Sequence, residues 1–282
     1  MGIDKKMCRI CKKSGQLEYF FKNTKDSLWK VTSLEQVFSC KNCHGAFREY
    51  ETVYPTISSK SFLRKYFAKY ISKIESEIYI KYLKNKTDFL FKTSLDVGSG
   101  FGHFVHQLNN LGVDAYGVES DEDTINDSVT KKNNHEYFDE NFSSVKKYDL
   151  ISLNHCLYYF DDSFVILDKV RQLLNDNGLI FITTNNPEGS FWENNVTWAG
   201  GSKVWLSKKN FQELHELGLK LIDITSFNNN LFESYNLYKR KKITKFSLLV
   251  KMMMYLSKIV KIQEPEIDGI HNFILLKKMQ ND

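Results

Sequence analysis

Apolar residues between positions 90 and 225 alternate between short continuous runs and positions spaced along one helical face. The runs have the length of buried strands, and the spaced positions fit helices of roughly ten residues. The strand-like runs cover residues 94–97, 114–118, 148–153 and 179–184, and the helical spacings cover 102–111 and 162–174. Because strands and helices alternate in this order, the pattern predicts an α/β domain built on a parallel sheet.

Further elements are expected on both sides of this region. Those downstream cover residues 208–217 as a helix and 219–225 and 272–277 as strands. Upstream, Ser58 or Ser59 can cap a helix, so residues 51–92 are predicted to form a connecting helical segment. The apolar positions that define its expected buried face are Leu63, Phe67, Tyr70, Ile71, Ile74 and Ile78.

A basic amphipathic insertion is expected near residues 240–262. Leu249, Met253 and Leu256 share one helical face there, and lysines lie opposite. We interpret this helix as packing on the main domain, with contact to a membrane surface as the less favoured alternative.

Length and charge narrow the class of protein. The 282 residues suffice for one large core and a small additional module. The net charge of +5 arises from 39 basic and 34 acidic residues, an excess too dilute to indicate a nucleic-acid binder without a localised patch. No apolar stretch approaches the ~18 residues that span a bilayer, and the first residues lack the apolar region of a signal peptide. We therefore expect a cytoplasmic protein.

Four of the five cysteines form two C-x2-C pairs. Cys8 and Cys11 make the first pair, Cys40 and Cys43 make the second, and Cys156 stands apart. Two such pairs supply the four thiolates that structural zinc prefers, and a reducing compartment disfavours disulfides. Residues 1–50 are therefore predicted to form a small zinc module, whose complete ligand set leaves the metal no open position for catalysis.

A glycine-rich turn follows the first predicted strand of the main domain. Gly98, Gly100 and Gly102 alternate with other residues directly after Asp96. Glycines let a nucleotide-like ligand approach the backbone and permit positive φ angles. A dinucleotide-binding turn would place its third glycine at position 103, where this chain has His103. The spacing thus disfavours a pyrophosphate site.

The turn resembles motif I of class I S-adenosylmethionine-dependent methyltransferases, which have the pattern acidic-x-Gly-x-Gly-x-Gly. The resemblance implies a Rossmann-like seven-stranded sheet with helices on both faces, over residues 93–282, preceded by the zinc ribbon. It also implies a cofactor site made by Asp96, Gly98, Gly100, Phe101, Gly102, Glu119, Asp139 and Asn154.

Individual positions of that site carry different expectations. Glu119 ends the second strand, where an acidic side chain can accept both ribose hydroxyls. Asp139, after an expected short strand over 136–138, resembles the residue near the adenine amine, and Glu140 and Asn141 are the alternatives.

Candidate catalytic residues follow the fourth strand. Methyl transfer is an in-line displacement that requires alignment and removal of a proton from the acceptor. His155 has a suitable pKa range, and Tyr158 and Tyr159 can position an acceptor or relay a proton. Members of the family often carry a histidine somewhat later in this loop. The zinc module is expected to pack outside the crevice that these residues line.

The cysteine pattern also resembles the zinc ribbon found before bacterial methyltransferase domains, including those that act on sugars. This resemblance favours a small-molecule or glycan acceptor, such as a nucleotide-linked sugar or a precursor in polysaccharide biosynthesis. One alternative is an RNA methyltransferase whose zinc ribbon binds nucleic acid. Another is a non-catalytic cofactor-binding module.

Overall fold

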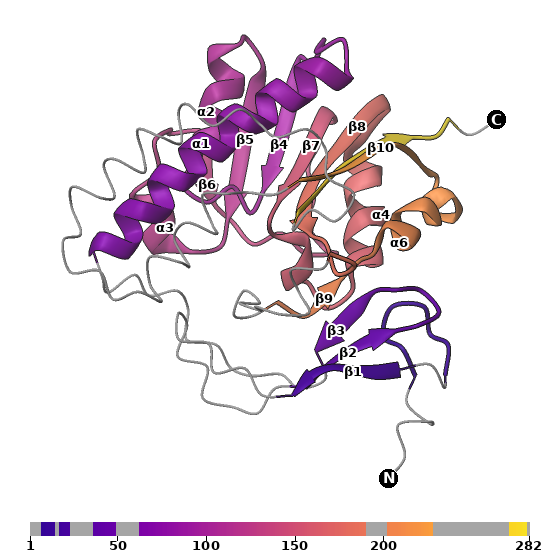
Figure 1. Cartoon of the computed structure of the whole chain (residues 1–282). Coiled ribbons are helices and arrows are strands. Elements are labelled where there is room, and N and C mark those ends of the chain that lie inside the picture. The colour runs from indigo at the N-terminus through magenta and orange to yellow at the C-terminus, as the bar shows by residue number, and fades with distance from the viewer. Residues whose placement is uncertain are drawn as a thin grey trace.

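The computed structural model describes residues 7–14, 17–22, 36–48, 62–189, 202–227 and 271–280 (Figure 1). The predicted helix near 240–262 and the predicted helix cap at Ser58 or Ser59 lie outside the described residues. None of the helices among the described residues combines the length and the hydropathy that a membrane span requires.

A seven-stranded sheet forms the centre of the molecule, as predicted. Its strands are β4 (Thr93–Val97), β5 (Asp114–Glu119), β6 (Asn133–His135), β7 (Tyr148–Asn154), β8 (Leu174–Asn185), β10 (Leu219–Phe227) and β11 (His271–Lys278). Their order across the sheet is β10-β11-β8-β7-β4-β5-β6. The pairs among β4 to β8 are parallel, whereas β11 pairs antiparallel with both of its neighbours. The carboxyl ends of five strands therefore meet at one edge.

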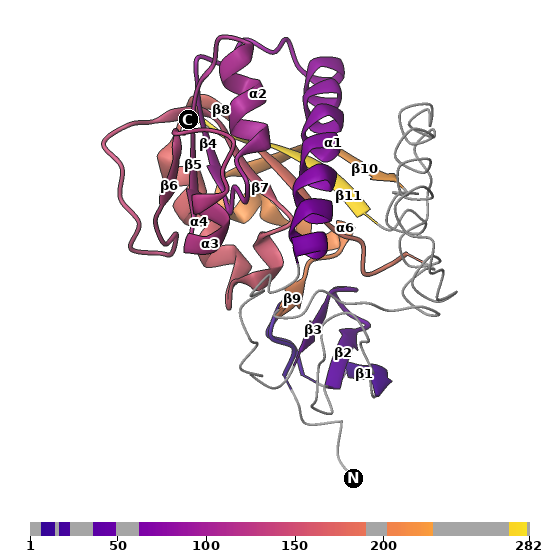
Figure 2. The ribbon, with the colours of Figure 1, turned by 90° about the vertical axis from the view of Figure 1, so that its left-hand side faces the viewer.

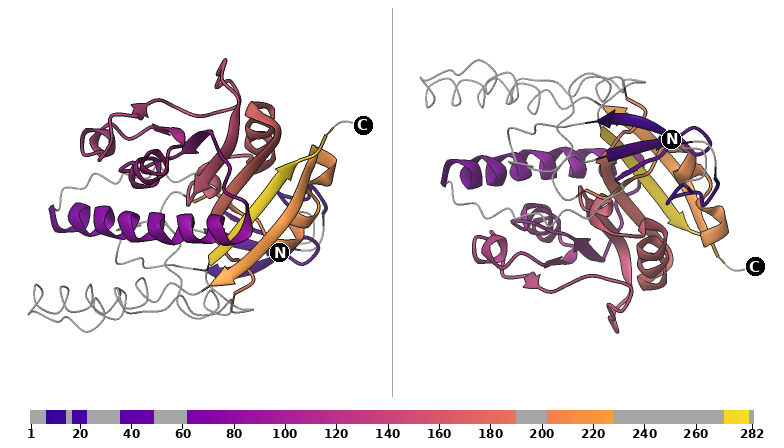
Figure 3. Two further views of the ribbon diagram at one scale, coloured as in Figure 1. Left: turned by 90° about the horizontal axis from the view of Figure 1, so that it is seen from above. Right: turned by 90° about the horizontal axis from the view of Figure 1, so that it is seen from below.

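Helices cover both faces of this sheet. Figure 3 shows α1 (Phe62–Lys86) on one side and α4 (Ser163–Leu173) on the other. The first face also carries α2 (His103–Asn110), and its core includes Phe181 and Phe273. Alternate sheet residues such as Ile182 turn to the second core, because successive side chains of a strand point to opposite faces. The shorter helical elements are α3 (Glu122–Asn126), η2 (Leu157–Tyr159), α6 (Lys208–Gln212) and η3 (Leu214–Leu217).

The buried face of α1 differs from the predicted one. Tyr79, Tyr82 and Leu83 are buried, whereas Ile74 and Ile78 are only half-buried. Aromatic rings fill the space between α1 and the sheet, with the Tyr79 and Tyr82 rings each packing against two sheet phenylalanines. The predicted positions ended at Ile78, so the prediction missed the aromatic side chains of the last two turns, which pack on the sheet.

Two predicted strand boundaries are wrong. The short strand expected over 136–138 is β6, which lies three residues earlier and begins at Asn133. Its sequence, Asn-Asn-His, has no apolar signal from which a strand could be predicted. The strand expected over 179–184 is β8, which begins earlier, at Leu174, and whose register with β7 jumps between Tyr148 and Leu150.

The cysteine pairs belong to a second sheet with four strands. It contains β1 (Leu17–Lys22), β2 (Gln36–Cys40), β3 (Ala46–Arg48) and β9 (Val204–Trp205), in that order. Strand β9 comes from the segment that follows β8, and it pairs antiparallel with β3. Figure 2 shows β9 between the cysteine strands and the large sheet. We call the described residues up to Arg48 the cysteine module.

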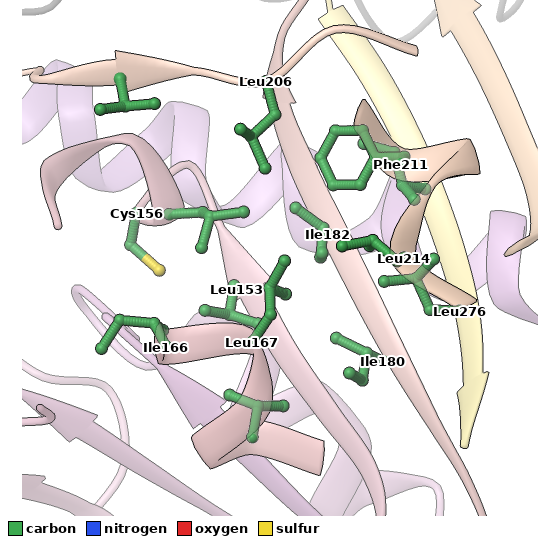
Figure 4. Packing of buried hydrophobic residues seen from close by; sticks show 14 of the residues in the cluster. Leu153, Cys156, Ile166, Leu167, Ile180, Ile182, Leu206, Phe211, Leu214 and Leu276 are labelled. Atoms are coloured by element: carbon green, nitrogen blue, oxygen red, sulfur yellow. The ribbon is translucent and has the colours of Figure 1, made fainter. Parts of the chain in front are cut away.

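The cysteine module and the large sheet share one hydrophobic core. Phe47 of β3 belongs to the same buried cluster as Leu206, Phe211 and Ile182. Figure 4 shows Leu206 and Phe211 packed beside Ile182 of β8. The module therefore continues the core of the main domain at one edge of the sheet.

That edge is the one at which the parallel strands end. The backbone of Tyr158, just after β7, accepts a hydrogen bond from Lys203, and Glu188, just after β8, contacts His44 of the module. Strand β9 and the contact between His44 and Glu188 bring the module against the loops at this edge, and the expectation that it packs outside the crevice stays a prediction.

Candidate functional site

The turn after β4 takes the left-handed conformation that its glycines permit. The φ angles of Gly98, Gly100 and Gly102 are 66°, 55° and 73°. A Cβ atom on Gly98 would lie 2.7 Å from Cys156 Cβ, and one on Gly102 would lie 2.8 Å from Ser128 Oγ. Around Gly100, no atom of the described residues lies within 4 Å of that position. Packing thus requires the outer glycines, whereas the middle one borders open space that a ligand can enter.

Glu119 is held against this turn, and its expected contact with ribose stays a prediction. It ends β5, and its Oε2 accepts a hydrogen bond from the Gly100 amide at 2.9 Å. Its Oε1 accepts another from the Asp121 amide at 3.0 Å. These two bonds fix the carboxylate beside the open side of the glycine turn, a suitable place for binding ribose hydroxyls.

Asn133 also supports the turn, a role that could not be predicted from the sequence. Its Nδ2 donates to the Gly100 carbonyl at 2.8 Å, and its Oδ1 accepts a hydrogen bond from Ser99. The side chain is buried at the first residue of β6. An asparagine in a polar segment carries no sequence pattern that marks such a role.

Asp96 is buried below the turn and orients the end of β7. Its Oδ1 accepts hydrogen bonds from Ser152 Oγ at 2.6 Å and from Asn154 Nδ2 at 3.0 Å. Burial raises the pKa of Asp96 to about 7, and these two bonds lower it in part. Asp96 thereby links the predicted cofactor residue Asn154 to the strand that carries the glycines.

The remaining predicted cofactor residues flank the turn. Phe101 lies between Gly100 and Gly102, and its half-buried ring is 5.9 Å from Lys69 Nζ. Asp139 is half-buried, and its carboxylate accepts from the Asn141 amide at 2.8 Å. Among the described residues no hydrogen bond joins Asp139 to the glycine turn, and its role at adenine stays a prediction.

The loop after β7 carries the three predicted catalytic residues. His155 has a φ of 54°, and its amide donates to the Thr183 carbonyl at 2.9 Å. Its ring lies edge-on to the buried His271, with centroids 5.1 Å apart. Burial lowers the pKa of His155 to about 4, so its imidazole is neutral near pH 7.

Tyr158 and Tyr159 differ in their access to solvent. Tyr158 is 5% exposed and Tyr159 is 36% exposed, and their ring centroids lie 4.7 Å apart. Burial raises the pKa of both phenols, to about 12 for Tyr159, so both are protonated at neutral pH. Each can donate a hydrogen bond, and neither is a strong base.

Glu75 of α1 is a titratable group of the same region that sequence reasoning missed. It lies one helical turn before Tyr79, whose hydroxyl neighbours its carboxyl, and its charge also acts on Tyr158. Burial raises the pKa of Glu75 to about 7, against a smaller opposite effect of Tyr79. A lone glutamate on a helix ordinarily indicates a solvated face, so only the position of α1 over the sheet reveals it.

The four paired cysteines come together as predicted. Their sulfur atoms all lie within 4.8 Å of one another, with Cys8 and Cys43 3.9 Å apart and Cys11 and Cys40 3.7 Å apart. Four sulfurs at about 2.3 Å from a tetrahedral zinc ion are roughly 3.8 Å apart, so the cluster fits zinc. A hydrogen bond with Cys8 and burial raise the pKa of the Cys43 thiol, and a bound cation would supply the charge that thiolates need here.

Comparison with known proteins agrees with this geometry. A family described as "Methyltransferase domain" matches residues 62–240. A comparison with curated proteins gives no match. Among solved structures, the chain is similar to an S-adenosylmethionine-dependent methyltransferase from Archaeoglobus fulgidus, with 19% identity, a TM-score of 0.52, and coverage of 77% of this chain and 100% of that chain.

A second similar structure is an S-adenosylmethionine-dependent methyltransferase from Clostridium acetobutylicum, with 12% identity, a TM-score of 0.48, and coverage of 80% of this chain and 95% of that chain. At these identities the likeness to solved structures concerns the fold.

Proposed function

Since this chain belongs to the methyltransferase-domain family and is an S-adenosylmethionine-dependent methyltransferase, we propose that it methylates a small molecule or a glycan precursor. A nucleotide-linked sugar or a surface-polysaccharide precursor is the acceptor class we favour. The observation that carries the cofactor site is the Gly100 amide bonded to Glu119 beside open space. The charge excess of the chain is dilute, which argues against an extended RNA surface.

We assign the cofactor to the edge formed by β4, β5 and β7. The open side of Gly100 would admit the methionine part, Glu119 would accept the ribose hydroxyls, and Asn154 would border the sulfonium. S-adenosylmethionine supplies an electrophilic methyl group when bound. The protein's task is then to align the acceptor and take up its proton.

Two groups are candidates for the proton acceptor. Glu75 has a pKa near neutrality, neighbours Tyr79, and its charge acts on Tyr158, which suits a general base at physiological pH. His155 is neutral at pH 7 but weakly basic. We assign the hydroxyls of Tyr158 and Tyr159 to acceptor positioning, because both phenols stay protonated.

We propose that the four cysteines hold one structural zinc ion. The four cysteines would fill all four ligand positions of a tetrahedral ion, which would leave no place for a reacting group. Elemental analysis of protein prepared without chelator is expected to find about one zinc per chain, and a metal-free preparation would contradict the assignment.

The acceptor class is tested by following the methyl group. The protein is incubated with radiolabelled S-adenosylmethionine and a cell extract separated into RNA, glycan and small-molecule fractions. We expect label in the small-molecule or glycan fraction, whereas label in RNA would favour the alternative activity. Calorimetry with S-adenosylhomocysteine and with NAD tests the cofactor independently, and binding of NAD alone would overturn its assignment.

A further inference from the structure

Two consecutive backbone hydrogen bonds connect the cysteine module to the Tyr158–Tyr159 turn. The Arg48 amide, at the end of β3, donates to the Lys203 carbonyl at 2.9 Å. The Lys203 amide donates in turn to the Tyr158 carbonyl at 2.7 Å. One residue thus bridges the last strand of the module and the turn that we assign to acceptor positioning.

A second set of contacts joins the module to the loop after β8. Glu188 accepts a hydrogen bond from the Lys208 amide at 2.9 Å and lies 3.2 Å from His44 Nδ1. The Cys43 carbonyl accepts a hydrogen bond from Ser207 Oγ at 2.6 Å. The turn that carries a metal ligand is therefore fixed to the same segment that supplies β9.

Packing makes this junction stiff. Trp205 of β9 is fully buried, and the Arg48 guanidinium lies 5.6 Å from the centre of its ring. Leu206 and Phe211 continue the buried cluster into the large sheet. A displacement of β3 would therefore displace β9, and with it Lys203 and the Tyr158–Tyr159 turn.

We propose that the cysteine module is a positioning element for the acceptor side of the methyl-transfer site, acting through Lys203 on the Tyr158–Tyr159 turn. This inference rests on the proposed function for the identity of that turn. Metal binding orders the module, because much of the folding energy of a small zinc site comes from the metal. Among the described residues, the glycine turn after β4 makes none of these contacts with the module, so metal loss loosens the acceptor side and spares the cofactor side.

Hydrogen exchange on the full chain tests this division. The metal-loaded protein is compared with protein treated with a strong chelator, and peptides covering the glycine turn and residues 155–160 are followed by mass spectrometry. We expect chelation to speed exchange at least about tenfold in the module and at residues 155–160, with little change at the glycine turn. Unchanged exchange at residues 155–160, or equal loosening of the glycine turn, would overturn the proposal.

Variants at one position test the bridge without removing the metal. Lys203→Pro deletes the amide donated to Tyr158, while Lys203→Ala keeps both backbone bonds and loses only the side-chain pair with Asp161. We expect Lys203→Pro to keep its zinc and its affinity for S-adenosylhomocysteine within about twofold, yet to lower label transfer at least about tenfold. Lys203→Ala should behave like the wild type, since an exposed ion pair contributes little.

The outcomes distinguish failure of the positioning role from failure of the proposed function. Loss of S-adenosylhomocysteine binding in Lys203→Pro equal to its loss of transfer would overturn the positioning role. If the wild type itself fails to bind S-adenosylhomocysteine, the proposed function fails, while the exchange experiment still reports whether the module orders the turn.

Discussion

Gly100 and Gly112 share a backbone state but differ in what they face. Both have positive φ angles, 55° and 85°, and within the part of the chain that the structure describes a Cβ atom at either position meets nothing within 4 Å. Gly112 lies between α2 and β5, away from the edge where the strands end. A change to alanine should therefore cost a similar strain of about 1–2 kcal/mol at each position.

We expect Gly100→Ala to weaken S-adenosylhomocysteine binding at least tenfold and Gly112→Ala to leave it unchanged. The added methyl group at Gly100 occupies ligand space, and a tenfold loss corresponds to only about 1.4 kcal/mol. Calorimetry gives the affinities, and thermal unfolding confirms that both variants are destabilised alike. Equal affinities in the two variants would place the cofactor elsewhere.

Glu75 makes the pH profile of the reaction informative. Its pKa of about 7 means that a base at this position becomes active as pH rises through neutrality. We expect the transfer rate to rise between about pH 6 and 8 in the wild type, and to lose both that rise and most of its magnitude in Glu75→Gln. Glu77→Gln is the control, since Glu77 is exposed on the same helix.

A rise that persists in Glu75→Gln would instead point to Asp96, whose pKa is also about 7. His155 cannot account for it, because its pKa of about 4 leaves it deprotonated throughout this range. The profile thus distinguishes the candidate carboxyl groups from the imidazole.

At the scale of elements, β9 is small but central. Its Trp205 is fully buried between the cysteine strands and the main core. We expect Trp205→Ala to destabilise the protein by about 3–5 kcal/mol and to speed zinc release to a coloured chelator under native conditions. Phe181→Ala, which empties a fully buried site on the other face of the large sheet, should destabilise comparably without speeding zinc release. Equal release rates would show that β9 does not hold the cysteine module in place.

The elements that could be predicted from the sequence are those in which apolar side chains recur at the spacing of a strand or a helix. The alternation of runs and helical spacings gave β4, β5, β7 and α4 within one or two residues. It missed β9, because a strand of two residues has no period and its partner β3 lies far away in the chain.

The same limit applies to the candidate site. The glycine turn, Glu119 and the cysteines were predictable because their spacing itself reflects the chemistry. Asn133 and Glu75 were not, since their roles depend on which helix or strand passes beside the turn.

For the whole molecule, buried titratable groups act on stability in opposite directions. The pKa of His155 is about 4 in the folded protein and about 6.5 in the unfolded chain, so the folded state binds fewer protons between these values. The free energy of unfolding therefore falls as pH drops from 6.5 towards 4. Asp96 and Glu75 have raised pKa values, so the folded state binds more protons than the unfolded chain between about pH 4 and 7. Their contribution to the free energy of unfolding therefore falls as pH rises through this range.

Comparing the wild type with His155→Gln isolates the contribution of His155 to the pH dependence of stability. We expect the melting temperature of His155→Gln to fall less than that of the wild type between pH 7 and pH 5, by a few degrees. Circular dichroism at a series of pH values measures the difference. Parallel curves for the two proteins would mean that the imidazole is hydrated in the folded state.

The pairing of β3 with β9 also constrains the order in which the chain can mature during synthesis. A nascent chain that has emerged only as far as β3 carries the cysteines but lacks the strand that completes their sheet. Until residues 204–205 leave the ribosome, β3 has an unpaired edge of the kind that joins other chains and aggregates. Early binding of a metal ion would therefore order the nascent cysteine module and limit its aggregation while the five parallel strands are still being synthesised.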